Sequence, residues 1–195
     1  MRSTRRSVLS VSASFAVALV LSWARPARAQ ESGASGAATV RPAAASPDTT
    51  WASWQLVLGD WMAESGGGEP AAASAGGDSY RPDLAGRVLV RRYWSAYPAT
   101  ATRSAFRDEG LMIVYPEGGG WRATAFDNEG HVIWYVATAT DTVVTLVSDV
   151  VPGAPRFRLS YRGAGADRLS IRFEIAPPGQ PEAFRTYVEG QVRRR

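Results

Sequence analysis

Arginine residues next to aromatic ones are the most suggestive chemical groups in this sequence. An arginine fork can hold a carboxylate while aromatic rings pack against the apolar part of the same molecule. The ligand-binding candidates are Arg92, Trp94, Arg122, His131, Trp134 and Tyr135. The alternative is that these arginines point outward and pair with acids, because buried charge is rare without a partner. Both faces of the segment RVLVRRYW carry an arginine, so the sequence leaves open which face is interior.

His131 is the one histidine, and the chain has no cysteine. Catalytic zinc takes several nitrogen or sulfur ligands, so this composition argues against a zinc enzyme. No Gly-x-Ser-x-Gly segment marks a serine nucleophile. A single axial histidine could hold a haem, whereas the simpler expectation is that His131 ends a tight turn. We expect no metal and no cofactor, with haem as the minor alternative.

Two pairs of acidic residues, Asp108 with Glu109 and Asp127 with Glu129, lie beside glycines. Glycine and acidic residues together favour exposed turns, where carboxylates are solvated. This placement indicates ordinary surface acids rather than a pair for general acid–base catalysis. The chain is therefore expected to be a binding protein more than an enzyme.

The segments that carry these residues have the pattern of β-strands. Phe157, Leu159 and Tyr161 alternate with polar residues, and positions 168–175 alternate in the same way. Such alternation predicts a sheet with one apolar face and one wet face. The expected strands are RVLVRRYW, LMIVY, WRATAF, HVIWYVAT, TVVTLVS, RFRLSYR, RLSIRFEI and FRTYVEGQV, with turn-forming residues between them.

Closing such a meander into a barrel removes its exposed edges. We predict an all-β fold, an antiparallel up-and-down barrel of eight to ten strands with one short N-terminal helix. Asp48 to Leu58 is the helix candidate, with Asp48 as its cap, and residues 66–77 are expected to form a long loop. The rival α+β fold needs several amphipathic helices, which the sequence does not offer.

Gly59 and Trp61 form a Gly-x-Trp motif that enters the first strand after the helical turn. Followed by a strand meander with arginine near its end, this motif resembles the calycin group, which contains lipocalins and fatty-acid-binding proteins. The resemblance implies that Gly59 bends the chain and that Trp61 closes the barrel base under Arg193 or Arg185; a ligand-contact role for Trp61 is the alternative. The segments GRVLVRRYWSAYP, AFDNEGHVIWY, PRFRLSY and FEIAPPGQPEAFRTYVEG are also similar to uncharacterised bacterial lipocalin-like proteins of the DUF1579 type.

Residues 1–29 have the organisation of a secretory signal peptide. Arginines precede an apolar run at about 8–24, and Ala27-Arg28-Ala29 is a small-x-small cleavage pattern. Serines interrupt the run, which argues against a stable membrane span. Thr4 to Leu9, with Arg5 and Arg6, resembles the twin-arginine motif; an ordinary signal peptide is the alternative. The protein is expected to be exported to the periplasm or the exterior.

The rest of the chain divides into a flexible linker at 30–47, rich in glycine, alanine, serine and proline, and one domain at 48–195. The precursor has 22 basic and 18 acidic residues, and residues 1–29 contain five arginines, so 17 minus 18 leaves the remainder at −1. A nearly neutral chain gives no reason to expect a nucleic-acid partner.

The sequence thus supports three hypotheses about function. The first is an exported, non-enzymatic binder of a small apolar or amphipathic ligand, with an acidic group as one option. The second is a barrel enzyme with Arg92 or Arg122 as electrostatic stabiliser and His131 or a tyrosine as acid–base group. The third is a barrel filled by its own side chains that serves a structural or partner-binding role.

Overall fold

The computed structural model describes residues 51–64 and 75–195 of the chain. The expected signal peptide at 1–29, the linker at 30–47 and the cap Asp48 lie outside the described residues. No helix within the described ranges is long and apolar enough to cross a membrane.

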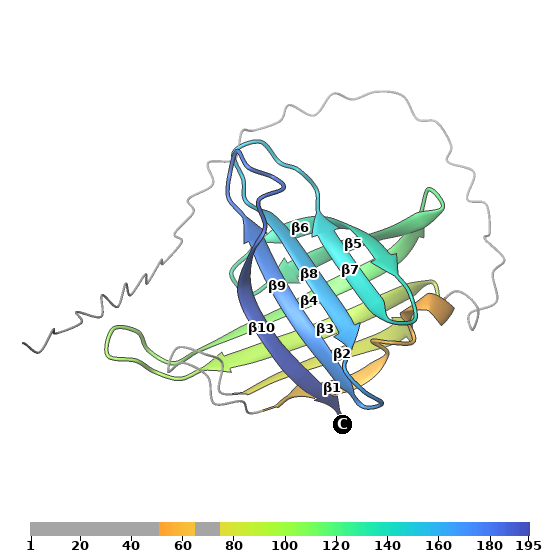
Figure 1. The fold of residues 1–195 in the computed structure, drawn as a ribbon, viewed down its shortest axis with the longest axis horizontal. Helices are drawn as coiled ribbons and strands as arrows, with labels where there is room; N and C mark the ends of the chain where they lie inside the picture. The colour runs from red at the N-terminus through yellow and green to blue at the C-terminus, as the bar shows by residue number, and fades with distance from the viewer. Residues whose placement is uncertain (1–50, 65–74) are drawn as a thin grey trace, which may run out of the picture. The chain divides into compact units, whose positions relative to one another are not determined.

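Ten antiparallel strands form a closed barrel in which each strand pairs with its neighbour in sequence and β1 pairs with β10 (Figure 1). The strands are β1 (Gly59–Ala63), β2 (Ala75–Asp83), β3 (Val88–Tyr97), β4 (Phe106–Glu117), β5 (Gly120–Asp127), β6 (Val132–Ala139), β7 (Val143–Ser148), β8 (Arg156–Gly163), β9 (Arg168–Ala176) and β10 (Arg185–Arg194). This architecture confirms the predicted all-β, up-and-down antiparallel barrel. The β3–β4 hairpin extends beyond its neighbouring strands (Figure 1).

The N-terminal helix is much shorter than predicted. Within residues 51–58, the described part of the expected segment, a single 3-10 turn forms, η1 (Ala52–Trp54). The amides of Trp54 and Val57 donate to the carbonyls three residues earlier at 3.0 Å. Trp51, Trp54 and Val57 are all buried, so this short turn closes the base of the barrel with its side chains.

Strand β2 begins inside the segment that the sequence predicted to be a loop. Its first residues include Gly76 and Gly77, which alone would weaken a strand. A side chain on Gly77 would lie 2.6 Å from Nε1 of Trp94 on β3, so the glycine lets this indole lie directly against the backbone. Pairing with β1 and β3 stabilises a segment whose local sequence disfavours a strand.

Strand β4 is longer than the predicted segment LMIVY and includes Asp108, Glu109 and Gly110. The prediction of an exposed turn at Asp108–Glu109 is therefore wrong. Gly110 has a packing role instead, because a Cβ atom there would meet the Tyr93 ring at 2.6 Å. The bulk of Tyr93 opposite Gly110 explains why a glycine fits inside this strand.

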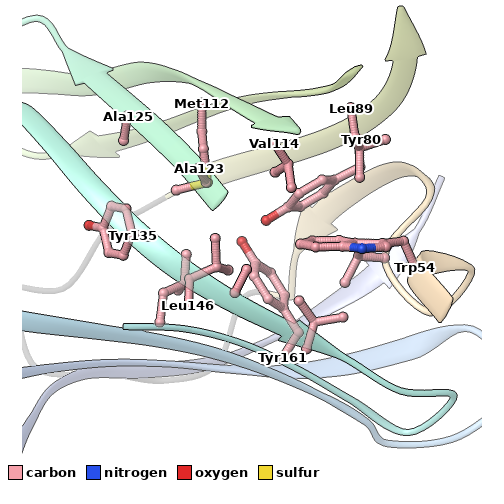
Figure 2. Packing of buried hydrophobic residues seen from close by; sticks show 14 of the residues in the cluster. Trp54, Tyr80, Leu89, Met112, Val114, Ala123, Ala125, Tyr135, Leu146 and Tyr161 are labelled. Atoms are coloured by element: carbon pink, nitrogen blue, oxygen red, sulfur yellow. The ribbon is translucent and has the colours of Figure 1, made fainter. Parts of the chain in front are cut away.

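The interior is apolar at the base of the barrel. Trp51 stacks on Trp121 with ring centres 4.8 Å apart, and Trp54 meets the same ring edge-on at 5.8 Å. The wall contributes the buried residues Leu89, Met112, Val114, Ala123 and Leu146, which Figure 2 labels. Val144, Leu159 and Leu169 are buried as well. Burial of this apolar surface is the main force that holds the barrel together.

Candidate functional site

A buried ion pair lies on the inner face of the barrel wall. Arg91 on β3 donates from Nε to Asp78 Oδ1 and from Nη2 to Asp78 Oδ2, both at 2.9 Å. Asp78 on β2 is 7% exposed and Arg91 is 8% exposed. Burial alone would lower the pKa of Arg91, but the Asp78 carboxylate outweighs it and the pKa lies well above its ordinary value. The Arg91 guanidinium therefore stays charged in a protected environment.

Two tyrosines extend this network toward the base. Tyr161 on β8 donates its hydroxyl to Asp78 Oδ2 at 2.8 Å. The ring of Tyr80 meets the Tyr161 ring edge-on with centres 5.6 Å apart (Figure 2). Burial raises the pKa of both phenols, so both remain protonated at ordinary pH. Four residues from three strands thus form one buried polar cluster.

Toward the opposite end, Arg91, Tyr93 and Tyr135 form a second group, which we call the inner site. The guanidinium carbon of Arg91 lies 4.3 Å from the Tyr93 ring centre. Tyr135 on β6 is 3% exposed. In Figure 2 its ring lies apart from those of Tyr80 and Tyr161, on the side of Ala125.

Polar atoms of the inner site lack partners within the described part of the chain. The guanidinium bonds of Arg91 run from Nε and Nη2, and Nη1 donates none. The sealed side-chain atoms without a hydrogen bond are Trp54 Nε1 and Tyr80 Oη. Because Arg91 Nη1, Tyr93 Oη and Tyr135 Oη are not among these, they border space that solvent can reach. The sealed atoms without a hydrogen bond therefore lie on Trp54 and Tyr80 and not at the inner site.

Carboxylates lie near Tyr93, at the rim of the barrel end that is opposite the tryptophan-filled base. Burial raises the pKa of Asp108 on β4, and the nearby Asp127 and Glu129 carboxylates raise it further. Burial and the Asp108 carboxylate raise the pKa of Tyr93 to about 12. The rim is therefore acidic, and the Tyr93 hydroxyl stays protonated.

His131 lies in the turn between β5 and β6, as the sequence predicted. Its Nδ1 lies 2.8 Å from Asp127 Oδ2, and its amide donates to Asp127 Oδ1 at 2.9 Å. The amide of Glu129 donates to the same oxygen at 3.0 Å. Asp127 therefore organises the turn, and the imidazole is an exposed partner of that carboxylate.

Two sequence candidates, Arg92 and Trp94, lie on the outer wall. They line a groove of about 640 Å³ that crosses β1 to β5 and also contains Arg107 and Phe126. The guanidinium carbon of Arg107 lies 4.1 Å from the Trp94 ring centre. The structure brings these residues together in a groove that Asp78 and Tyr93 also line, while the Arg92 side chain alternates with that of Arg91 along β3.

Arg122 and Trp134 also face outward. Arg122 donates from Nη1 and Nη2 to the Asp149 carboxylate at 2.9 and 2.6 Å, which matches the alternative of outward arginines paired with acids. Trp134 is 49% exposed. Tyr135, its neighbour in sequence, is the one predicted candidate in the inner site.

Asp78, Arg91, Tyr93 and Tyr161 were not among the candidates that the sequence indicated. Arg91 is next to the candidate Arg92 in the sequence. The two are distinguished only by which face of β3 is buried in the barrel, and that face carries Arg91. Asp78 follows a glycine pair directly after the predicted loop at 66–77, and the structure places it in β2. The alternation that makes Tyr161 an inward residue was visible, but its partner lies 83 residues away in the chain.

The described residues contain no group of three or more histidine, aspartate or glutamate side chains that could hold a metal ion. No family model matches the chain, and no curated protein matches its sequence. The closed antiparallel barrel is consistent with a calycin-like fold, while no family match supports the narrower resemblance to DUF1579-type proteins.

Proposed function

We propose that this barrel binds a small amphipathic molecule at the inner site. The observation that supports this most is the set of hydrogen-bonding atoms on Arg91, Tyr93 and Tyr135 that face solvent-accessible space without a protein partner. Buried polar groups in folded proteins are almost always hydrogen-bonded, so water or a ligand must satisfy these atoms. A concave apolar wall with a few polar groups is the usual form of a small-molecule site.

The wall around the inner site is suited to an apolar chain or ring. Ala123, Ala125 and Ala137 are buried on β5 and β6, and Ala123 pairs with Tyr135 across these strands. Phe157 and Phe173 stack with ring centres 5.8 Å apart on β8 and β9. Such a ligand would pack against these walls and place its polar end near Arg91.

We also propose that the protein is exported after removal of residues 1–29. The support is the charged start, apolar run and small-x-small end of that segment. An extracytoplasmic carrier of a poorly soluble molecule is a function that a small barrel of this kind supports.

Titration with the neutral fluorescent probe N-phenyl-1-naphthylamine tests the binding proposal. Wild-type protein should enhance probe fluorescence saturably. Ala125→Leu fills the interior and should weaken binding at least about tenfold, because steric exclusion removes the probe's contacts. Thr124→Leu, on the neighbouring outward position, is the matched control and should bind as wild type does.

Each variant is first checked for wild-type circular dichroism and melting. If folded wild-type protein binds neither this probe nor anionic or cationic analogues, the binding proposal is wrong. That outcome would favour the third hypothesis, a barrel filled by its own side chains.

A further inference from the structure

The carboxylate-binding edge of the interior arginine is already occupied. Nε and Nη2 of Arg91 form the two-donor edge that normally grips a carboxylate, and here they hold Asp78. Tyr161 donates a further hydrogen bond to the same carboxylate. The pair is electrically neutral as a unit, so the interior arginine offers little net attraction to an acidic ligand.

The groups that remain unpaired at the inner site are chiefly donors. Arg91 Nη1 can only donate, since a guanidinium has no acceptor. The Tyr93 and Tyr135 hydroxyls can donate as well, because burial raises the pKa of both phenols and keeps them protonated. Hydrogen-bond donors on β3 and β6 complement an acceptor such as a carbonyl oxygen.

The rim adds negative charge beside this donor set. Asp108 on β4 and Asp127 on β5 lie near Tyr93, and both carboxylates raise the pKa of that phenol. Glu129 adds a third negative group near Asp108. Arg103 lies further out on the β3–β4 hairpin, with its guanidinium carbon 4.1 Å from the Phe106 ring centre, and Arg107 on the same hairpin pairs with Glu109. An anion seated at Arg91 would lie among like charges, which is a strong basis for rejection.

We infer that the polar end of the ligand is an uncharged hydrogen-bond acceptor, such as a ketone, ester or amide carbonyl, and that the site rejects carboxylates. This inference rests on the proposed function. It replaces the acidic ligand that the sequence allowed with a neutral carbonyl compound held by Arg91 Nη1 and the Tyr135 hydroxyl.

Displacement of bound N-phenyl-1-naphthylamine by three ligands of equal chain length tests the inference. The ligands are decanamide, decanoate and decylamine at pH 8, where the acid and the amine are both charged. Decanamide should displace the probe at a concentration at least about tenfold lower than decanoate. Equal or tighter binding of decanoate, tightest binding of decylamine, or no displacement by decanamide would each overturn the inference. Because the probe must bind first, these results are distinct from failure of the proposed function itself.

Paired variants identify the residues that make the site prefer decanamide to decanoate. Asp108→Asn removes one negative charge and should reduce the preference for decanamide, measured as the ratio of the decanoate and decanamide concentrations that displace the probe, at least about threefold. Glu109→Gln changes the adjacent outward carboxylate and should leave the ratio unchanged. Tyr135→Phe should weaken decanamide about fivefold with unchanged probe binding, since only a hydrogen bond is lost. An unchanged ratio in Asp108→Asn, or unchanged decanamide binding in Tyr135→Phe, would contradict the inference.

Discussion

The guanidinium carbon of Arg194 lies 4.2 Å from the centre of the Trp61 ring, while its Nη1 donates to the carbonyl of Leu58 at 2.6 Å. The indole of Trp61 donates from Nε1 to the carbonyl of Val57 at 2.8 Å. A Cβ atom on Gly59 would lie 2.7 Å from Arg194 Nη1, and the φ angle of Gly59 is +105°. Position 59 therefore needs glycine for two reasons, the close approach of Arg194 and the backbone conformation. The arginine over the tryptophan is Arg194, not Arg193 or Arg185.

Trp61→Ala should lower the free energy of unfolding by about 3–5 kcal/mol, as other large-to-small changes in cores do. Trp61 is buried, and its loss also removes the platform for Arg194. Urea denaturation measures the difference. Trp134→Ala is the control and should stay within about 0.5 kcal/mol of wild type, because Trp134 lies on the outer wall. Unchanged melting with lost ligand binding would instead make Trp61 a ligand contact.

Asp78→Ala should destabilise the fold by about 3–5 kcal/mol, because it leaves the Arg91 guanidinium buried and unpaired. Chemical denaturation at neutral pH measures the loss. Asp149→Ala breaks the more exposed pair with Arg122 and should cost at most about 1 kcal/mol.

The double variant Asp78→Leu with Arg91→Met should recover most of that stability, since a well-packed apolar pair can replace a buried ion pair. A double variant as unstable as Asp78→Ala alone would show that the pair is needed for folding in its own right.

Glu174 should make the fold sensitive to acid. Arg158 donates to its carboxylate from Nε at 2.6 Å and from Nη2 at 2.7 Å, and these hydrogen bonds lower the pKa of Glu174. A lowered folded-state pKa stabilises the fold above the unfolded pKa, and this contribution is lost as the pH falls through the folded value. Glu174→Gln should therefore be less stable than wild type by about 1 kcal/mol at pH 7.

The difference between wild type and Glu174→Gln should shrink as the pH falls below about 4. Urea midpoints at pH 7, 5 and 3 check this trend. Asp141→Asn, at an exposed position, serves as the control. A difference that stays constant across this range would mean that the glutamine acts by altered packing rather than by lost charge.

Export can be measured on the full precursor in a bacterial host. Mass spectrometry of the exported protein should show loss of residues 1–29 and a mature chain that begins at Gln30. Replacing Arg5 and Arg6 by lysine should block export if the twin-arginine resemblance holds. Intact precursor in the cytoplasm would contradict the signal peptide, and unchanged export of the lysine variant would indicate the ordinary secretory route.

The sequence by itself determined the strand pattern of the barrel wall. Leu159 and Tyr161 alternate with Arg158 and Arg162, and the structure buries the first pair and turns the second outward. This prediction was possible because a strand has a period of two and its inner face needs apolar side chains, both of which are local properties.

Only the tertiary structure decided which polar residues face the interior. Arg91 and Arg92 are adjacent, each shares its face with apolar and aromatic residues, and closure of the barrel alone turned Arg91 inward. Its partner Asp78 comes from a glycine-rich strand that pairing with β1 and β3 stabilises. Contacts between residues distant in sequence made this cluster, and the local periodicity that predicts strands carries no information about them.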